Sequence, residues 1–268
     1  MTDMTVFQKA GALERILSEI GSVAVAVSGG VDSMTLAHVA HRALGAGAMM
    51  IHARSPAVPK SASERVTRHA ERAGWRLMEI DAGEFADSRY RANPANRCYF
   101  CKTNLYGTMA AQTEAALVSG TNLDDLGDWR PGLKAADEYC VRHPFVEAGI
   151  DKACVRAIAR RLGLDDLAEL PAAPCLSSRV ETGIFVEAET LASIDRVETS
   201  LRDRLQPQTV RCRVVAKGIR IELDSGCFNS LGPDDLLSAR QVAATSFAGV
   251  DPDDVVIAPY RRGSAFLR

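Results

Sequence analysis

The chain has 268 residues, of which 47% are hydrophobic and 25% charged, and its formal net charge is −2. This balance is typical of a globular protein with one or two domains, and it argues against a disordered chain or a strongly basic nucleic-acid binder. No apolar run reaches the length of about 18 residues that a membrane helix needs. Acidic Asp3 precedes any apolar run, so we expect no secretory signal and a cytoplasmic protein.

Apolar runs alternate with helical patterns over the first part of the chain. Strands are predicted where aliphatic residues form short buried runs, and helices where apolar residues recur every three or four positions. The expected strands are 23–27, 48–53, 75–80 and 115–119, and the clearest expected helices are 34–44 and 61–74. This alternation predicts a parallel sheet with helices on both faces.

The pattern changes in the last third of the chain. An amphipathic helix is predicted at 186–205, followed by two alternating strands at 209–216 and 219–223 and a terminal strand at 255–258. The short Lys-Gly link between the two alternating strands predicts an antiparallel hairpin. We therefore expect a small α+β fold here.

Two domains follow from these patterns. Residues 1–183 are predicted to form an α/β domain, whose last clear helix begins at the capping residue Asp151 and ends at Gly163. Residues 184–268 are predicted to form the small α+β domain, which would bind substrate or make oligomer contacts.

A glycine turn follows the first predicted strand. Ser28-Gly29-Gly30-Val31-Asp32-Ser33 lies at the carboxyl edge of the expected sheet and opens a helix, where backbone amides and the helix dipole favour phosphate. The loop lacks the Gly-Lys-Ser/Thr ending of a Walker A motif. It resembles the PP-loop of the N-type ATP pyrophosphatases, which implies that ATP binds at Ser28, Gly29, Gly30, Asp32 and Ser33 and is split into AMP and pyrophosphate.

An acidic segment follows the fourth predicted strand. Asp124, Asp125 and Asp128 lie close to Arg130, again at the carboxyl edge. Carboxylates suit Mg²⁺ and an arginine suits phosphate, so we expect Asp124, Asp128 and Arg130 to bind Mg²⁺–pyrophosphate. The alternative is a capped, solvated loop.

Three cysteines ask for a chemical explanation. Cys98 and Cys101 form a C-x-x-C pair, and Cys175 lies between prolines and Arg179. One pair supplies half of a zinc site, and no second pair completes it. A structural zinc pair therefore stays open beside a catalytic or cluster-binding role.

Four segments together resemble the LarE family of ATP-dependent sulfur transferases. They are the loop 28–33, the segment from Asn122 to Gly132, Cys98-x-x-Cys101-Lys102, and Pro174-Cys175-Leu176-Ser177-Ser178-Arg179. The resemblance implies that a carboxyl group of a nucleotide-like pyridinium substrate is adenylated and then receives sulfur, in the biosynthesis of the nickel-pincer nucleotide cofactor. It also implies a homo-oligomer.

The resemblance implies two ways of supplying sulfur. In one branch of the family the cysteine matching Cys175 gives up its own sulfur. In the other, three cysteines hold a [4Fe–4S] cluster and leave one iron open. The presence of Cys98 and Cys101 together with Cys175 points to the cluster branch, so all three are expected to be metal ligands and catalytic residues.

The predicted hairpin carries two arginines on one face. Arg211 and Arg213 are separated by one residue and can hold one phosphate together, although a solvated sheet face is the alternative. The resemblance implies that they bind the substrate nucleotide, with Lys102, Arg179 and Glu222 as further substrate contacts.

Three other functions stay open at this point. One is a PP-loop amidating ligase that uses ammonia and needs no cysteine. Another is a cluster-dependent thiolase acting on a different acceptor, tRNA included, although no nucleic-acid partner is expected from the charge balance. The third is a nucleotide- or metal-binding module without turnover.

Overall fold

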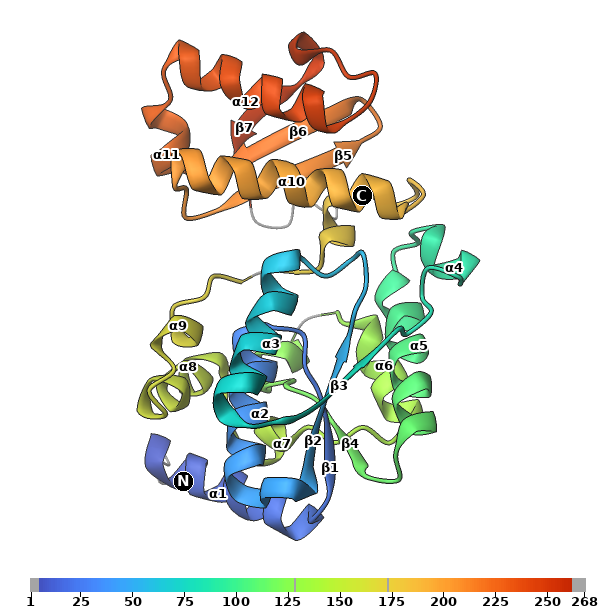
Figure 1. The fold of residues 1–268 in the computed structure, drawn as a ribbon, viewed down its shortest axis with the longest axis vertical. Coiled ribbons are helices and arrows are strands. Elements are labelled where there is room, and N and C mark those ends of the chain that lie inside the picture. The colour runs from blue at the N-terminus through green and yellow to red at the C-terminus, as the bar shows by residue number, and fades with distance from the viewer. Residues whose placement is uncertain (1–4, 128, 173, 262–268) are drawn as a thin grey trace. The chain divides into compact units, whose positions relative to one another are not determined.

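The computed structural model describes residues 5–127, 129–172 and 174–261. The chain forms two compact units, one of Met1–Glu84 and Cys98–Ala173, and the other of Phe85–Arg97 and Pro174–Arg268 (Figure 1). The second unit thus begins before the boundary predicted at residue 183 and also takes in a segment that follows the third strand. In the described part of the chain, no helix has the length and apolar character needed to cross a membrane.

The first unit is built on a sheet of four parallel strands. These are β1 (Val23–Ala26), β2 (Ala48–Ala53), β3 (Arg76–Ile80) and β4 (Ala116–Val118), in the order β3-β2-β1-β4. The parallel sheet confirms the sequence prediction. Because β1 pairs with both β2 and β4, the loop that leaves its carboxyl end lies between the loops that leave its two neighbours.

Helices cover both faces of this sheet. Successive residues of a strand point to opposite faces, so each strand contributes to two separate hydrophobic cores. Val23 and Val25 enter one core and Ala24 enters the other. The first core is completed by α1 (Val6–Ile20), α2 (Val31–Leu44), α3 (Lys60–Ala73), α7 (Pro144–Glu147), α8 (Lys152–Arg161) and α9 (Asp165–Ala168), and the second by α5 (Arg97–Gln112) and α6 (Pro131–Glu138). Figure 1 shows α5 and α6 on the opposite side of the sheet from α2 and α3. The short 3-10 helices η1 (Gly45–Gly47) and η2 (Leu123–Gly127) lie in the connections.

Helix α8 begins where the sequence predicts it. The carboxylate of Asp151 accepts a hydrogen bond from the Cys154 amide at 2.7 Å, which satisfies one of the unpaired donors of the first turn. Val155 and Ile158 are buried on the face toward the sheet. The left-handed conformation of Gly163, with φ of 70°, then lets the chain turn away.

The second unit contains a three-stranded sheet in the order β5-β6-β7. The predicted hairpin is present as antiparallel β5 (Val210–Val215) and β6 (Gly218–Leu223), and β7 (Val256–Pro259) pairs in parallel with β6. The remaining elements are α4 (Ser88–Arg91), η3 (Leu176–Arg179), α10 (Ala188–Leu205), α11 (Ser225–Ser230), α12 (Pro233–Ser246) and η4 (Pro252–Asp254). Helix α10 packs on β5 and on α12.

Segment 85–97 belongs to this unit because it forms hydrogen bonds with residues far from it in the sequence. The Val186 amide donates to the carbonyl of Arg91 at 2.8 Å, and Asn93 Nδ2 donates to the carbonyl of Glu181 at 2.8 Å. The hydroxyls of Tyr90 and Ser177 lie 2.6 Å apart. These contacts hold the stretch around Ser177 to a segment that separates β3 from α5 in the chain.

Candidate functional site

The loop from Ser28 to Ser33 is curled at the carboxyl end of β1. The Ser28 amide donates to the Ser33 hydroxyl at 3.0 Å, and Gly30 is the residue before the first turn of α2. Gly29 has φ of 79°, and a Cβ atom there would lie 2.6 Å from the carbonyl oxygen of Ala62. Glycine is therefore required for this close approach. The amides at the start of α2 form the kind of anion site that phosphate occupies.

Arg65 on α3 and His52 on β2 support the loop and the residue before it. Arg65 Nη1 donates to the carbonyl of Gly29 at 2.8 Å. Buried His52 lies 2.8 Å from the carbonyl of Val27 through Nδ1 and 2.9 Å from the hydroxyl of Ser63 through Nε2. Burial lowers the pKa of His52, so the ring is neutral, with Nδ1 donating to the carbonyl and Nε2 accepting from the hydroxyl.

The end of β4 packs directly on the phosphate loop. A Cβ atom at Gly120 would lie 2.7 Å from the amide nitrogen of Ser33 and 2.8 Å from the carbonyl carbon of Asp32. The backbone after β4 therefore touches the first turn of α2. This contact brings the acidic segment that follows Gly120 to the phosphate loop.

Asn122 connects the acidic segment to the loop. Its buried side chain donates from Nδ2 to Asp32 Oδ1 at 3.1 Å, while its Oδ1 accepts from the Asp124 amide at 3.0 Å. Arg130 forms an ion pair with Asp125 at 2.7 Å. The structure thus places Asp32, Asp124 and Arg130 around one edge of the sheet, whereas Asp128 lies outside the described residues.

Lys152 is a candidate site residue that the sequence patterns did not indicate. Its ammonium contacts the carboxylate of Asp32, and its amide donates to Asp124 Oδ2 at 3.1 Å. It is the first residue of α8, directly after the predicted cap Asp151. The only local signal was its place at a helix start, which says nothing about a partner 120 positions earlier in the chain.

Cys98 and Cys101 lie on the first turns of α5. They are three positions apart and so project from the same side of the helix, with Cys98 exposed and Cys101 partly buried. A Cβ atom at Gly132 would lie 3.0 Å from Cγ of Lys102 and 3.5 Å from the Cys98 carbonyl, so the start of α6 packs closely on this turn. The Lys102 ammonium lies 5.6 Å from the centre of the Tyr106 ring.

None of the seven cysteines, all of which are described, forms a disulfide. Cys98 and Cys101 belong to the first unit and Cys175 to the second. Within the described ranges, no three His, Cys, Asp or Glu side chains gather in a metal-binding arrangement. Binding of one cluster by all three cysteines therefore stays a prediction from the sequence.

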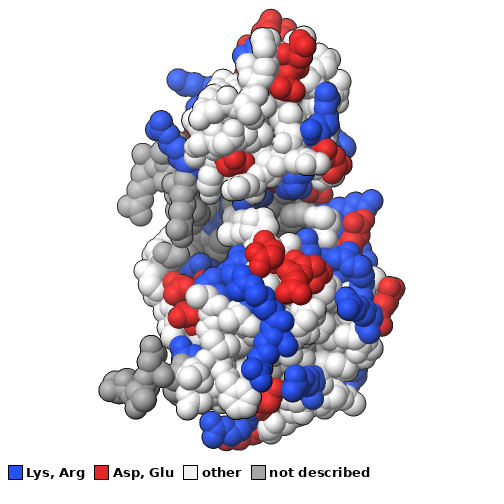
Figure 2. Space-filling model, turned by 90° about the vertical axis from the view of Figure 1, so that its left-hand side faces the viewer, with Lys and Arg blue, Asp and Glu red and all other residues white. Residues whose placement is uncertain are grey.

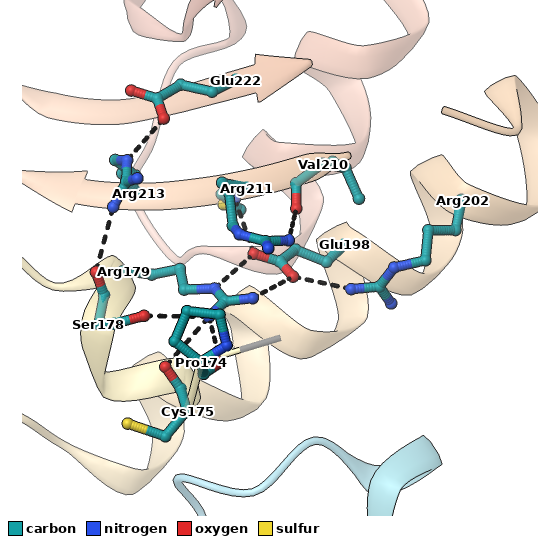
Figure 3. A network of polar contacts seen from close by, with 11 residues as sticks. Pro174, Cys175, Ser178, Arg179, Glu198, Arg202, Val210, Arg211, Arg213 and Glu222 are labelled. Carbon is teal, nitrogen blue, oxygen red and sulfur yellow. Dashed lines mark hydrogen bonds and ion pairs between the residues drawn. The ribbon is translucent and has the colours of Figure 1, made fainter. Parts of the chain in front are cut away.

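Cys175 precedes the short helix η3, and its side chain is exposed. Arg179 Nη1 donates to the carbonyls of Pro174 and Cys175, the second at 3.1 Å, and to the Ser178 hydroxyl at 3.0 Å. The Cys175 sulfur points away from these contacts (Figure 3). The backbone of this turn is therefore held from one side while the thiol faces the other.

Arg179 itself is buried against Glu198 on α10. Nε and Nη2 of Arg179 donate to the two carboxylate oxygens of Glu198 at 2.9 and 3.1 Å. Glu198 also accepts from Arg202 at 2.8 Å (Figure 3) and from the Cys212 amide at 3.0 Å. Both members of the Arg179–Glu198 pair are at most 2% exposed, so this is a desolvated pair rather than a surface contact.

The two arginines of β5 have different partners. Arg213 donates to Glu222 at 2.7 Å and to the Ser178 carbonyl at 3.1 Å. Arg211 donates to the Val210 carbonyl at 2.7 Å and lies 5.9 Å from the centre of the Tyr260 ring. Burial, followed by the charge of Arg179, lowers the pKa of Arg211 to about 10, so its guanidinium stays protonated at neutral pH.

Charges of both signs lie side by side on the surface. On the face shown in Figure 2, acidic and basic side chains are interspersed rather than gathered into a wholly basic area. This agrees with the nearly neutral composition.

The parallel sheet with helices on both faces, the glycine loop at its carboxyl edge and the acidic segment beside that loop define an α/β protein of the PP-loop class. No protein-family model matches the chain. Relatives that match most of the chain identify a narrower family within this class.

The chain is 40% identical to an uncharacterized protein of Synechocystis sp. over 215 residues, which cover 79% of this chain and 80% of the relative. It is 30% identical over 224 residues to the pyridinium-3,5-bisthiocarboxylic acid mononucleotide synthase of Lactiplantibacillus plantarum, covering 82% of this chain and 80% of that enzyme. An uncharacterized protein of Methanocaldococcus jannaschii is 27% identical over 185 residues, which cover 68% and 69% of the two chains. The chain belongs to the LarE family of sulfur transferases.

Proposed function

We propose that this protein is an ATP-dependent sulfur transferase that activates a carboxylate of a nucleotide-like pyridinium substrate and replaces one carboxyl oxygen by sulfur. In this proposal it serves the biosynthesis of a nickel-pincer nucleotide. The observation that carries it is the phosphate loop of a LarE-family chain, fastened to an acidic segment and a lysine at the carboxyl edge of the sheet.

The first step is adenylation. A carboxylate oxygen of the substrate attacks the α-phosphorus of ATP, the bond to the bridging oxygen breaks, and pyrophosphate leaves with the electron pair. The amides at the start of α2 and the hydroxyls of Ser28 and Ser33 would hold the phosphates. Lys152 and Arg130 would neutralise the charge that develops on pyrophosphate.

Mg²⁺ fits the donors at this edge. Asp32 and Asp124 supply carboxylate oxygens, the ligands that Mg²⁺ prefers, and Lys152 contacts both residues. Asp128, four positions after Asp124 in the sequence, is the third acid that we assign to this role. Bound Mg²⁺ would supply charge neutralisation for the leaving pyrophosphate.

The second step replaces AMP by sulfur. Sulfide attacks the carbonyl carbon of the acyl adenylate, AMP leaves with the bonding electron pair, and a thiocarboxylate forms. If the Cys175 thiolate attacks instead, the Cβ–S bond of the resulting thioester then breaks by elimination, the Cα proton leaves, and dehydroalanine remains at position 175. We assign the sulfur chemistry to Cys175, Cys98 and Cys101. The exposed Cys175 thiol and the one-sided pair on α5 fit the thiolate donors that a [4Fe–4S] cluster needs. Such a cluster, when bound, supplies an iron with an open position for sulfide.

Substrate recognition is assigned to the basic residues. Arg211 and Arg213 on one face of β5 suit the phosphate of a mononucleotide, and Glu222 orients Arg213. Lys102, one position after Cys101, would approach a second anionic group of the substrate. Arg179, expected from the sequence to contact the substrate, is engaged with Glu198 and with backbone carbonyls.

The family also supports two expectations about the protein in the cell. We expect a homo-oligomer acting in the cytoplasm on a small molecule. Size-exclusion chromatography with light scattering measures the oligomeric state directly, and a strictly monomeric active enzyme would contradict that expectation.

The proposal is tested on anaerobically purified protein incubated with MgATP and a pyridinium dicarboxylate mononucleotide. We expect AMP, pyrophosphate and a product in which sulfur replaces one carboxyl oxygen. The Cys175→Ala variant should still form AMP and pyrophosphate but no sulfur-containing product. An amidating ligase would instead use ammonia and keep full activity in this variant, and a binding module would release no pyrophosphate.

A further inference from the structure

Segment 174–179 presents the exposed Cys175 thiol, and one buried side chain, that of Arg179, donates three hydrogen bonds within it. Arg179 is the last residue of η3, and its guanidinium reaches back to the carbonyls of Pro174 and Cys175 and to the Ser178 hydroxyl (Figure 3). Carbonyl oxygens of a tight turn need donors, and here one planar group donates to two of them.

Glu198 sets the orientation of that guanidinium. The two carboxylate oxygens accept from Nε and Nη2 of Arg179, which leaves Nη1 directed toward the turn. Glu198 is itself tied to β5 through the Cys212 amide at 3.0 Å. The chain of contacts therefore runs from the second sheet through α10 to the backbone of Cys175.

The geometry points away from a direct substrate contact for Arg179. Its side chain is about 1% exposed, and the Cys175 sulfur projects away from it. A lysine has a single ammonium without a planar fork, so it cannot hold Glu198 with two donors and still reach both carbonyls. The arrangement thus depends on arginine specifically.

We propose that Arg179 is a positioning residue that fixes the backbone of the Cys175 turn, with Glu198 holding its guanidinium in place. This inference rests on the proposed role of Cys175 in sulfur transfer. It follows that Arg179 affects the rate of sulfur transfer but not the rate of adenylation.

The test compares Arg179→Lys with Arg202→Lys. Arg202 also donates to Glu198, at 2.8 Å, but its side chain is 38% exposed and lies on the other side of Glu198 from Cys175 (Figure 3), so it is the matched control. Single-turnover sulfur transfer and AMP formation are measured in parallel. Arg179→Lys should lower the rate of sulfur transfer at least about tenfold with AMP formation within about twofold of wild type, because small misplacements of a reacting group are costly.

Hydrogen–deuterium exchange gives a readout that does not need activity. The Ser178 amide donates to the Cys175 carbonyl at 3.0 Å and the Val180 amide to the Ser177 carbonyl at 3.2 Å. In Arg179→Lys these amides should exchange about tenfold faster or more, whereas Arg202→Lys should leave them unchanged, because local opening governs their exchange. If the wild type forms AMP but no sulfur-containing product, the proposed function is wrong. The exchange rates still test whether Arg179 fixes the backbone of the Cys175 turn.

Two outcomes would overturn the inference. One is wild-type sulfur transfer and exchange in Arg179→Lys. The other is equal losses of AMP formation and sulfur transfer in both lysine variants, which would indicate a purely structural pair. Ser178→Ala removes one contact of Nη1 without unbalancing the buried charge, so it decides the question if Arg179→Lys does not fold. It should slow sulfur transfer relative to AMP formation in the same direction.

Discussion

Gly120 lies against Ser33 so closely that a single methyl group between them would stand 2.7 Å from the Ser33 amide nitrogen. Gly120 follows β4, and Ser33 lies in the first turn of α2, which follows the neighbouring parallel strand β1. Because both partners are backbone, neither can rotate away. This contact and the hydrogen bond from Asn122 to Asp32 join the acidic segment to the phosphate loop.

The Gly120→Ala variant should therefore damage ATP use. We expect a loss of stability of about 1–3 kcal/mol, as for overpacking a tight contact, and a raised KM for MgATP in pyrophosphate release. Gly127→Ala is the control, since a Cβ atom there meets nothing within 4 Å. It should change stability by no more than about 0.5 kcal/mol. Equal KM values in both variants would contradict the assigned contact.

Lys152 should contribute to the ATP step. Removing its charge in Lys152→Met should raise the KM for MgATP or lower the rate of pyrophosphate release by about tenfold, the size of one charge-assisted hydrogen bond. Lys60→Met, on the exposed face of α3 in an ion pair with Glu64, is the control and should retain wild-type kinetics. If Lys152→Met behaves like this control, the ion pair with Asp32 is only structural.

Iron binding should depend on Cys98 and Cys101 of the first unit but not on Cys140, which belongs to the same unit. After anaerobic reconstitution, Cys98→Ser and Cys101→Ser should lose most iron and acid-labile sulfide, because both thiolates are assigned as ligands. Cys140→Ser is the matched control, as Cys140 is likewise exposed and lies outside the pair. Stoichiometric zinc without iron in the wild type would instead support the structural zinc alternative.

The protein should lose stability in mild acid through His38. Burial first, then the charges of His69 and His41, lower the pKa of His38 to about 4, although Asp166 acts in the opposite direction. The unfolded state binds the proton at its ordinary pKa of about 6.5, so stability present above that pH is lost as pH falls toward about 4.

Urea unfolding at pH 7 and pH 5 measures this effect. After discounting for the partial exposure of the ring, we expect His38 to account for about 1–2 kcal/mol of the loss. His38→Gln should show a correspondingly smaller difference between the two pH values. An unchanged difference would assign the acid sensitivity to other groups, such as His52 and His143, whose pKa values burial also lowers.

Local sequence patterns predicted the elements well, because their causes are local. The strands of the parallel sheet and the cap of α8 at Asp151 depend on residues within a few positions of each other. The pairing of Lys152 with Asp32 depends on how distant strands and helices are brought together, and no spacing in the chain encodes it.

The second unit shows the same difference between local and distant causes. Alternation within 209–223 predicted the hairpin, but nothing local indicated that segment 85–97 would belong to the same unit. Arg179 carried a charge that suggested an anionic substrate. In the structure Arg179 pairs with Glu198 on the next helix, α10. The sequence does not indicate this pairing, because an acidic residue in an amphipathic helix is normally expected to face solvent.

The most direct test of the account is the mass of the product from one turnover. Anaerobic wild-type protein with MgATP and a pyridinium dicarboxylate mononucleotide should give AMP, pyrophosphate and a substrate in which one carboxyl oxygen has been exchanged for sulfur. In Cys175→Ala the nucleotide products should persist and the exchange should disappear. Oxygen-to-sulfur exchange that survives in Cys175→Ala, or wild-type turnover that yields AMP with no sulfur in the product, would contradict the account.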